Sequence, residues 1–109
     1  MRAGLTAAPI DLQFPPRPIT AAVVRALVDS RLWDYVLCHL CHGLDAAERV
    51  TPGADIRAVV CARCQRYTIS GRTILAFRIT EVNDPARSRI HRASLSTRAA
   101  DSADVFPVP

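Results

Sequence analysis

The sequence contains no lysine, and all fourteen of its basic side chains are arginine. This absence excludes enzymes that form a Schiff base through lysine, and P-loop proteins, whose lysine contacts the phosphates. Long apolar runs are also missing, because the longest stretch without Asp, Glu, Lys or Arg has ten residues, from Tyr35 to Leu44. A membrane-spanning helix needs about 20 apolar residues. We therefore expect no transmembrane segment and no membrane partner.

The N-terminal segment lacks the pattern of a secretory signal. Pro9 and Asp11 interrupt it before an apolar core of sufficient length can form. We therefore expect a cytoplasmic protein, and in that reducing compartment cysteines bind metal ions more often than they form disulfides. A length of 109 residues suffices for one small domain, which excludes an enzyme with separate substrate and cofactor domains.

The positive charge of the chain is concentrated in one segment. The net charge is +4, and residues 85–98 contain four arginines and no acidic residue, whereas residues 99–109 contain two aspartates and no arginine. A local excess of arginine indicates contact with an anionic partner more directly than the net charge does. We predict that residues 84–109 form an extended C-terminal arm, first basic and then acidic, because large apolar side chains are rare there.

The chain before residue 20 is predicted to form a second arm. Residues 1–19 show little helix or strand pattern, and Pro15, Pro16 and Pro18 favour an extended conformation. A helix is expected to follow Thr20, whose hydroxyl can accept a backbone N–H, and to run to about residue 36. The apolar positions that predict this helix recur every four residues, at Val24, Val28, Leu32 and Val36.

Mainly β structure is predicted after the helix. Residues 45–48 are expected to form one helical turn, and residues 56–60 a strand, because they are rich in β-branched side chains. Residues 67–69 and 72–80 are expected to pair as a hairpin around the two-residue loop Ser70-Gly71. The folded domain should therefore comprise residues 20–83, between the two arms.

Four cysteines form two C-x2-C pairs, Cys38 with Cys41 and Cys61 with Cys64, separated by nineteen residues. This spacing is typical of zinc sites. Each short turn can direct two sulfurs at one ion, and four thiolates complete a tetrahedron without an open position. We therefore predict a structural Zn²⁺ site. Metal binding worth about 10 to 16 kcal/mol could decide whether so small a core folds.

The two cysteine knuckles, with a strand before the second and a hairpin after it, resemble the zinc-ribbon class over roughly residues 35–80. Together with the predicted helix, the expected fold is a small α+β metal-stabilised domain, a helix followed by a four-cysteine zinc ribbon. The resemblance implies a setting in transcription, translation, replication or nucleic-acid processing assemblies. Many zinc-ribbon knuckles carry Gly just after the second cysteine, whereas Gln65 follows Cys64 here, and Gly43 follows Cys41 by two positions. The sequence therefore indicates the class and no particular family.

Other uses of the same cysteines remain open. Residues 38–42 also match the haem attachment motif C-x-x-C-H, but haem would leave Cys61 and Cys64 unexplained. An Fe–S cluster or a single Fe uses the same four thiolates as zinc, so iron stays an alternative. A thioredoxin-like redox pair needs a βαβ unit, and a His-Asn-His nuclease needs a histidine-rich hairpin, and neither is predicted. We therefore expect no enzyme activity.

Two histidines, His39 and His42, flank the first knuckle. Either could replace a cysteine as a metal ligand. Four correctly spaced cysteines already complete the tetrahedron, so we predict that both imidazoles are solvated or contact the ligands from outside.

The leading functional hypothesis is a small zinc-stabilised binding module that belongs to a larger assembly and contacts nucleic acid, with no small-molecule substrate. Guanidinium groups suit phosphate, and an aromatic ring among them can stack on a base. The predicted nucleic-acid contacts are Arg63, Arg66, Tyr67, Arg72, Arg78, Arg87, Arg89 and Arg92. The alternative is a structural subunit, in a complex or a virion, whose arms wrap neighbouring subunits without binding nucleic acid.

Overall fold

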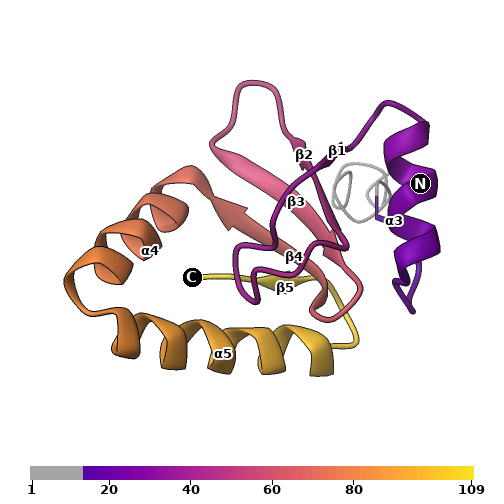
Figure 1. Cartoon of the computed structure of the whole chain (residues 1–109). Coiled ribbons are helices and arrows are strands. Elements are labelled where there is room, and N and C mark those ends of the chain that lie inside the picture. Colours follow the sequence, from indigo (N-terminus) through magenta and orange to yellow (C-terminus); the bar gives the residue numbers. More distant parts are fainter. Residues whose placement is uncertain (1–13) are drawn as a thin grey trace, which may run out of the picture.

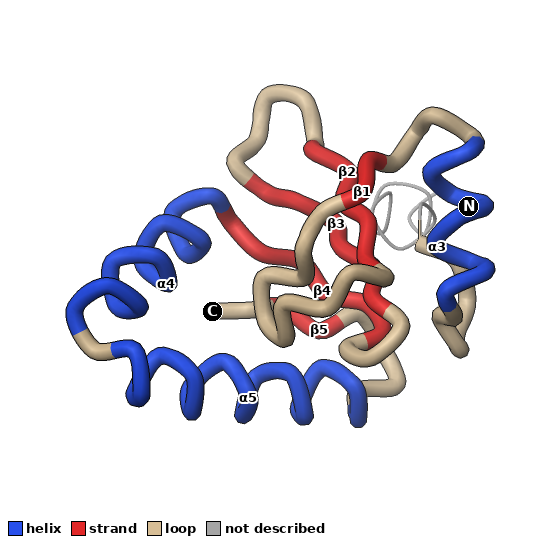
Figure 2. Tube along the Cα trace, in the orientation of Figure 1, coloured by secondary structure: helices blue, strands red, loops and turns tan. Residues whose placement is uncertain are grey.

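A computed structural model describes residues 14–109, which form a five-stranded sheet with helices on both faces (Figures 1 and 2). The elements in chain order are α3 (Ala21–Asp29), β1 (Asp34–Tyr35), β2 (Ala46–Val50), β3 (Ile56–Cys61), β4 (Gln65–Ser70), α4 (Gly71–Asn83), α5 (Pro85–Asp101) and β5 (Phe106–Pro107). Figure 1 shows α3 on one side of the sheet and the pair of helices α4 and α5 on the other. The α+β class predicted from the sequence is confirmed, but the predicted layout is not.

The sheet has the strand order β1-β2-β3-β4-β5 and separates two apolar cores. Neighbouring strands are antiparallel except β4 and β5, which are parallel. Side chains of β3 alternate between the faces, with Val59 and Cys61 in the core beneath α5 and Ala58 and Val60 in the core beneath α3. Burial on both faces explains why this strand has a nearly continuous apolar sequence.

Helix α3 begins where the sequence predicts and ends early. Thr20 is its N-cap, and the hydroxyl accepts the Val23 N–H at 3.2 Å. The predicted extension to about residue 36 is wrong. Arg31 has a φ of 68°, and this left-handed conformation ends the helical path. The chain then reverses so that β1 can pair with β2, and Trp33 is buried beneath α3.

The helical turn predicted at residues 45–48 is also wrong, because these residues lead into β2. Ala46 and Ala47 are fully buried on opposite faces of the sheet, so both cores hold this strand in place. The strand predicted at residues 56–60 is confirmed as β3, and residues 67–69 lie within β4. The hairpin, however, joins β3 to β4, so its turn contains Cys64 and not Ser70-Gly71.

Residues 71–83 form the helix α4, which corrects the strand predicted for residues 72–80. Ser70 is its N-cap, and the hydroxyl accepts the Thr73 N–H at 3.0 Å. In the helix, Ile74 and Phe77 reach the core beneath α5. In a strand, Phe77 would instead share one face with Leu75 and Ile79, because side chains alternate between the two faces. The N-cap at Ser70 and the core contacts of Ile74 and Phe77, three residues apart, therefore distinguish the helix from the predicted strand.

The predicted C-terminal arm is likewise wrong, since residues 85–101 form the helix α5 and residues 106–107 add the strand β5. Asp84 caps α5 by accepting the Arg87 N–H at 3.2 Å, and Pro85 occupies its first turn. Only one large apolar side chain of α5, Leu95, is buried, but the small Ser88, Ser96 and Ala99 let the helix approach the sheet closely.

The N-terminal arm is corrected for its described part. Phe14 and Ile19 are buried in the core beneath α3, and Arg17 donates a 2.7 Å hydrogen bond to the carbonyl oxygen of Ala100. The rest of the predicted arm, residues 1–13, lies outside the described residues. Within residues 14–109, no helix is long and apolar enough to cross a membrane.

Candidate metal centre

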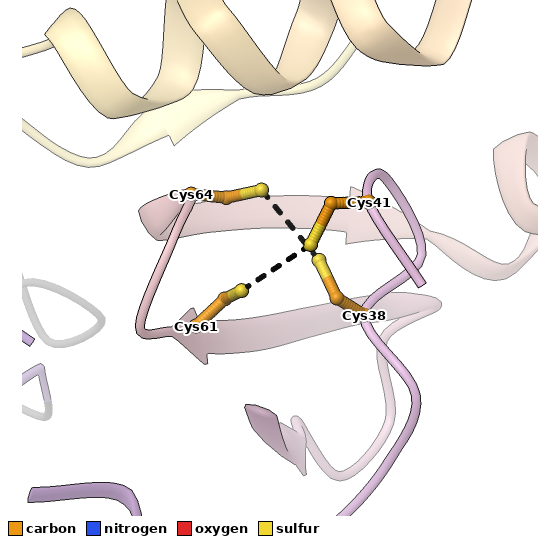
Figure 3. A group of neighbouring side chains, drawn as sticks. All are labelled: Cys38, Cys41, Cys61 and Cys64. Carbon is orange, nitrogen blue, oxygen red and sulfur yellow. Dashed lines mark hydrogen bonds between the residues drawn. The ribbon is translucent and has the colours of Figure 1, made fainter. Parts of the chain in front are cut away.

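The four cysteine sulfurs converge on one point between the two knuckles (Figure 3). All four Sγ atoms lie within 4.8 Å of one another, and the Cys38–Cys64 and Cys41–Cys61 distances are both 3.7 Å. A regular tetrahedron with Zn–S bonds of about 2.3 Å has S–S edges of about 3.8 Å. The sulfurs are also too far apart for disulfides, whose S–S bond is about 2.05 Å. The cluster can therefore hold one tetrahedral metal ion.

The first knuckle is a loop between β1 and β2 that hydrogen-bonds to itself. The Cys38 N–H donates to the Gly43 carbonyl at 3.0 Å, and the His42 N–H donates to the Cys38 carbonyl at 2.9 Å. His42 has a φ of 59°, so the chain turns through the left-handed region directly after Cys41. The Gly43 N–H then lies 3.4 Å from the Cys41 sulfur, where it can stabilise a thiolate.

The second knuckle is the turn of the β3–β4 hairpin. Cys61 is the last residue of β3, Cys64 precedes β4, and Gln65 has a φ of 70°. Gln65 thus has the left-handed conformation that favours glycine, the residue that many zinc-ribbon knuckles carry at this position. The hydrogen bonds of its side chain explain why glutamine stands there in this chain. Its side-chain Oε1 accepts the Ile19 N–H at 2.7 Å, and its Nε2 donates to the carbonyls of Ile19 and Ala62. Gln65 therefore fastens the N-terminal segment to this knuckle.

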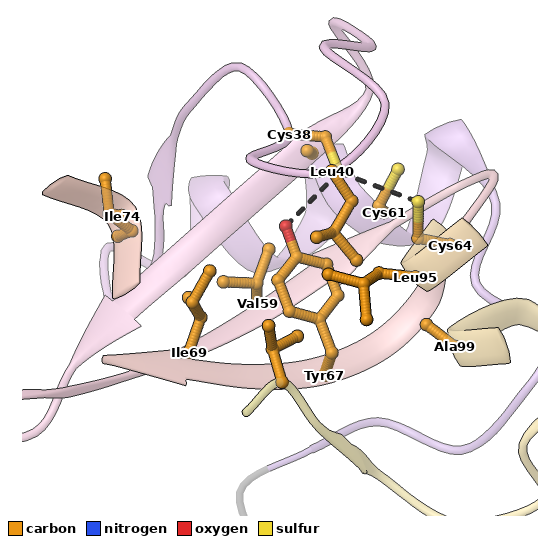
Figure 4. Packing of buried hydrophobic residues seen from close by; sticks show 12 residues of the cluster. Cys38, Leu40, Val59, Cys61, Cys64, Tyr67, Ile69, Ile74, Leu95 and Ala99 are labelled. Carbon is orange, nitrogen blue, oxygen red and sulfur yellow. Dashed lines mark hydrogen bonds between the residues drawn. The ribbon is translucent and has the colours of Figure 1, made fainter. Parts of the chain in front are cut away.

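Two hydroxyl groups from different elements contact the cysteine sulfurs. The Tyr67 hydroxyl, on β4, lies 3.2 Å from the Cys38 sulfur (Figure 4). The same hydroxyl accepts the His39 N–H at 3.1 Å. The Ser96 hydroxyl, on α5, lies 2.9 Å from the Cys64 sulfur. Each hydroxyl must be the donor once the sulfur is a metal-bound thiolate. These outer contacts orient the ligands, and they connect both the sheet and α5 to the centre.

The sulfurs perturb one another's ionisation. Hydrogen bonds with Cys41, Cys61 and Cys64 lower the pKa of Cys38 far below that of an ordinary thiol. Hydrogen bonding to Cys38 raises the pKa of Cys61 and of Cys64. For Cys41, the hydrogen bond with Cys38 raises the pKa, but hydrogen bonds with Cys61 and Cys64 outweigh it and lower the pKa to about 7. A divalent cation would replace the shared protons and stabilise all four thiolates together.

The two histidines lie outside the sulfur cluster. The His39 Nε2 is 3.0 Å from a carboxylate oxygen of Glu48, and the His42 Nε2 is 2.8 Å from the Arg92 Nη1. Arg92 also pairs with Glu81 of α4. The first knuckle is therefore linked to the sheet through His39 and to both C-terminal helices through His42.

The structure brings some of the predicted nucleic-acid contacts together and separates the others. Arg63, Arg89 and Arg92 line one hollow between the first knuckle and α5. Arg78 lines a neighbouring cleft with Arg92, and Arg87 lies near His91 on the other flank of α5. Arg72 is exposed at the start of α4, at the opposite end of β4 from the cysteine turn.

Two of the predicted contacts have different roles in the structure. Tyr67 is fully buried, so its ring cannot stack on a base, and the interpretation of this residue is wrong. Burial raises the pKa of its hydroxyl well above the ordinary value, which keeps the group a hydrogen-bond donor. Arg66 donates to the carbonyl oxygens of Pro15 and Ala103, so it joins the two terminal segments of the described chain.

Sequence reasoning missed the contacts of Tyr67 and Ser96 with the sulfurs. Tyr67 stands three residues after Cys64, on the β4 face that points to the centre, and a strand assignment alone places it there. No sequence signal connects Ser96 to Cys64, because the contact depends on how α5 packs against the sheet.

Comparison with known proteins gives no relative for this chain. No family model matches it, and neither the curated proteins nor the solved structures include a significant match. The functional argument therefore depends on the geometry alone.

Proposed function

We propose that the four cysteines hold one structural Zn²⁺ ion and that the chain is a zinc-stabilised binding module of a larger assembly. The distances of 3.7 Å between sulfurs of the two knuckles support a tetrahedral ion, and four thiolates leave no coordination position for a substrate. The outer hydroxyl contacts of Tyr67 and Ser96 support a centre that holds the fold together.

We further propose that the module binds nucleic acid through the arginines of α5 and the second knuckle. The observation that carries this proposal is the charge of α5, which from Pro85 to Ala100 contains four arginines and no acidic residue. Arg87, Arg89 and Arg98 are exposed on this helix, and Arg63 is exposed nearby on the second knuckle. Exposed guanidinium groups without competing carboxylates attract the phosphates of a nucleic-acid backbone.

Salt-dependent binding to labelled oligonucleotides tests this proposal. We expect binding to single-stranded and duplex DNA or RNA at about 50 mM salt, with a log–log salt slope that flattens by about 0.7 to 0.9 for each contacting arginine that is removed. The full-length chain without measurable affinity for any of these oligonucleotides at that salt would contradict the proposal.

The alternative function, a structural subunit that binds protein and not nucleic acid, is supported by a different surface. Three apolar side chains lie on the outer face of α4 and are largely exposed, Leu75 at 57%, Ile79 at 53% and Val82 at 81%. Exposed apolar side chains at helical spacing indicate a protein-binding face. The arms that this hypothesis assigned to wrapping are folded in the described chain, so the α4 face replaces them as its basis.

Sedimentation of the wild type and of Ile79→Glu distinguishes this alternative. If the α4 face binds another copy of the chain, the wild type should be an oligomer at high concentration and Ile79→Glu a monomer. Thr80→Glu, an exposed position next to Ile79 that does not line the depression shared by Ile79 and Val82, is the matched control and should not dissociate it. Monomeric wild type would remove self-association as the basis of the alternative.

A further inference from the structure

A hollow of 330 Å³ lies between the first knuckle and α5. Small-molecule sites range from about 300 to 1,000 Å³, so this hollow lies at the small end of that range. Its walls come from three places that are distant in the sequence: Cys41 and His42 of the first knuckle, Arg63 of the second knuckle, and Arg89 and Ser96 of α5. The metal centre therefore fixes the relative positions of the walls.

The hollow is lined by cationic groups and by no acidic residue. Arg63, Arg89 and Arg92 contribute guanidinium groups to its lining. Arg63 and Arg89 are exposed, and none of the ion pairs within residues 14–109 includes either of them. Both guanidinium groups are therefore free to donate hydrogen bonds to an anion.

Arg92 differs from the other two arginines because it is held in place. The residue is 9% exposed, and its Nη1 contacts Glu81 and His42. Its Nε is buried, and no described residue accepts a hydrogen bond from it. A buried donor without an acceptor is unfavourable, so this arginine retains bonding capacity that the described residues 14–109 do not use.

A competing role for these arginines is to neutralise the metal centre. Zn²⁺ with four thiolates carries a net charge of about −2, and Cys41 lines the hollow. The hydrogen bonds that the sulfurs receive in the described chain come, however, from Gly43, Tyr67, Ser96 and the other cysteines, and not from Arg63 or Arg89. Both arginines line the hollow and take no part in these bonds.

We propose that this hollow binds one phosphate group, which Arg63 and Arg89 hold between the zinc knuckles and α5. The inference rests on the proposed nucleic-acid function when the phosphate belongs to a backbone. The same guanidinium pair would also recognise a free phosphate or pyrophosphate, so the experiment must separate the two sources.

The test compares three double variants that remove the same charge. Arg63→Gln/Arg89→Gln alters the hollow. Arg72→Gln/Arg87→Gln alters exposed arginines of α4 and α5 that do not line the hollow, and Arg25→Gln/Arg31→Gln alters exposed arginines in and just after α3, on the opposite side of the sheet. Affinity for a labelled single-stranded oligonucleotide is measured by anisotropy, and binding of inorganic phosphate and pyrophosphate by ³¹P NMR. The zinc content of each variant is measured in parallel.

The proposal predicts that the hollow variant loses at least about tenfold more affinity than either control, because it loses charged hydrogen bonds in addition to screened charge. Its zinc content should stay at that of the wild type. Equal losses in Arg63→Gln/Arg89→Gln and in Arg72→Gln/Arg87→Gln would overturn the phosphate site and leave the nucleic-acid function standing. Loss of zinc from the hollow variant would assign these arginines to the metal centre and also overturn it.

The measurements with inorganic phosphate and pyrophosphate separate this site from the proposed function. If the wild type binds pyrophosphate through Arg63 and Arg89 and binds no oligonucleotide, the phosphate site stands and the nucleic-acid function fails. If it binds neither oligonucleotide nor inorganic phosphate, both fail.

Discussion

The two cysteine knuckles have the same local backbone conformation but differ in the interactions that keep them in place. Each is a C-x2-C turn followed directly by a residue in the left-handed conformation, His42 in the first and Gln65 in the second. The second knuckle is the turn of a hairpin in which six residue pairs are in register, from Ile56 with Ser70 to Cys61 with Gln65. The first is a loop outside the sheet, held by two backbone hydrogen bonds and by side chains from elsewhere.

This difference indicates how much each knuckle should depend on a bound metal. The sheet places Cys61 and Cys64 without help from a metal, since β3 is buried on both faces. Cys38 and Cys41 lie outside the sheet, and in the proposed zinc centre they would depend on the ion and on the Tyr67 hydroxyl to stay in position. If the proposed ion is bound, it should therefore contribute most of its stabilisation by ordering the first knuckle and, through His42 and Arg92, by fixing the helices against it.

The largest expected effect is that of metal removal. After chelation, amide hydrogen exchange should rise most in residues 38–43, because their few hydrogen bonds no longer have a metal to support them. Residues 57–60 of β3 should keep more protection than the first knuckle. Equal loss of protection in both knuckles would contradict the difference between them.

The second expected effect concerns the two left-handed positions. Gln65→Gly should destabilise the fold by about 1–3 kcal/mol, because the buried Ile19 N–H loses its acceptor and this exceeds the gain from relaxed backbone strain. His42→Gly loses only the partly exposed contacts of the imidazole with Arg92 and Glu81, so its change should be smaller. Urea unfolding of both variants measures the difference, and a larger cost for His42→Gly would reverse the comparison.

Tyr67→Phe should cost about 1–2 kcal/mol, because the variant leaves the His39 N–H without its acceptor and removes the donor to Cys38. It should also release the metal to a competing chelator faster than the wild type. Tyr35→Phe is the matched control, since Tyr35 is 54% exposed and should change neither quantity. Indistinguishable chelation rates for the two variants would show that the hydroxyl does not support the first knuckle.

The smallest expected effect is that of Ser96→Ala, at about 1 kcal/mol, because one hydrogen bond to the Cys64 sulfur is lost while the hairpin still holds that cysteine. Ser94→Ala on the same helix is the control, because Ser94 is exposed. Thermal unfolding of the two variants compares them. A loss from Ser96→Ala as large as that from Tyr67→Phe would mean that the second knuckle needs outer support as much as the first.

The sequence predicted the centre better than the fold around it. A C-x2-C pair is a local pattern, and its spacing limits how the two sulfurs can be arranged, so all four members of the cluster were predictable. The buried strand β3 was predictable for a similar reason, because its apolar run is short and rich in β-branched side chains. Both features depend on residues close together in the sequence.

The two C-terminal helices could not be predicted from the apolar pattern and composition of residues 71–101, whereas their N-cap residues, Ser70 and Asp84, do indicate helix starts. The apolar run in residues 73–79 fits alternation nearly as well as helical spacing, and the low content of large apolar residues after Asp84 resembles a disordered tail. Yet Asp84-Pro85 is a strong helix start, with an N-cap followed by proline in the first turn. The packing that places Ser96 beside Cys64 depends on tertiary contacts and has no local signal.

The identity of the bound ion is the most direct test of a structural zinc centre. The chain is purified without added metal, and elemental analysis is combined with the visible absorption spectrum, with Cys61→Ser as the comparison. We predict one zinc ion for each wild-type chain, no visible absorption band, and loss of both zinc and cooperative unfolding in Cys61→Ser. A folded wild-type chain that contains no metal, or one that contains iron with a charge-transfer band, would contradict the account.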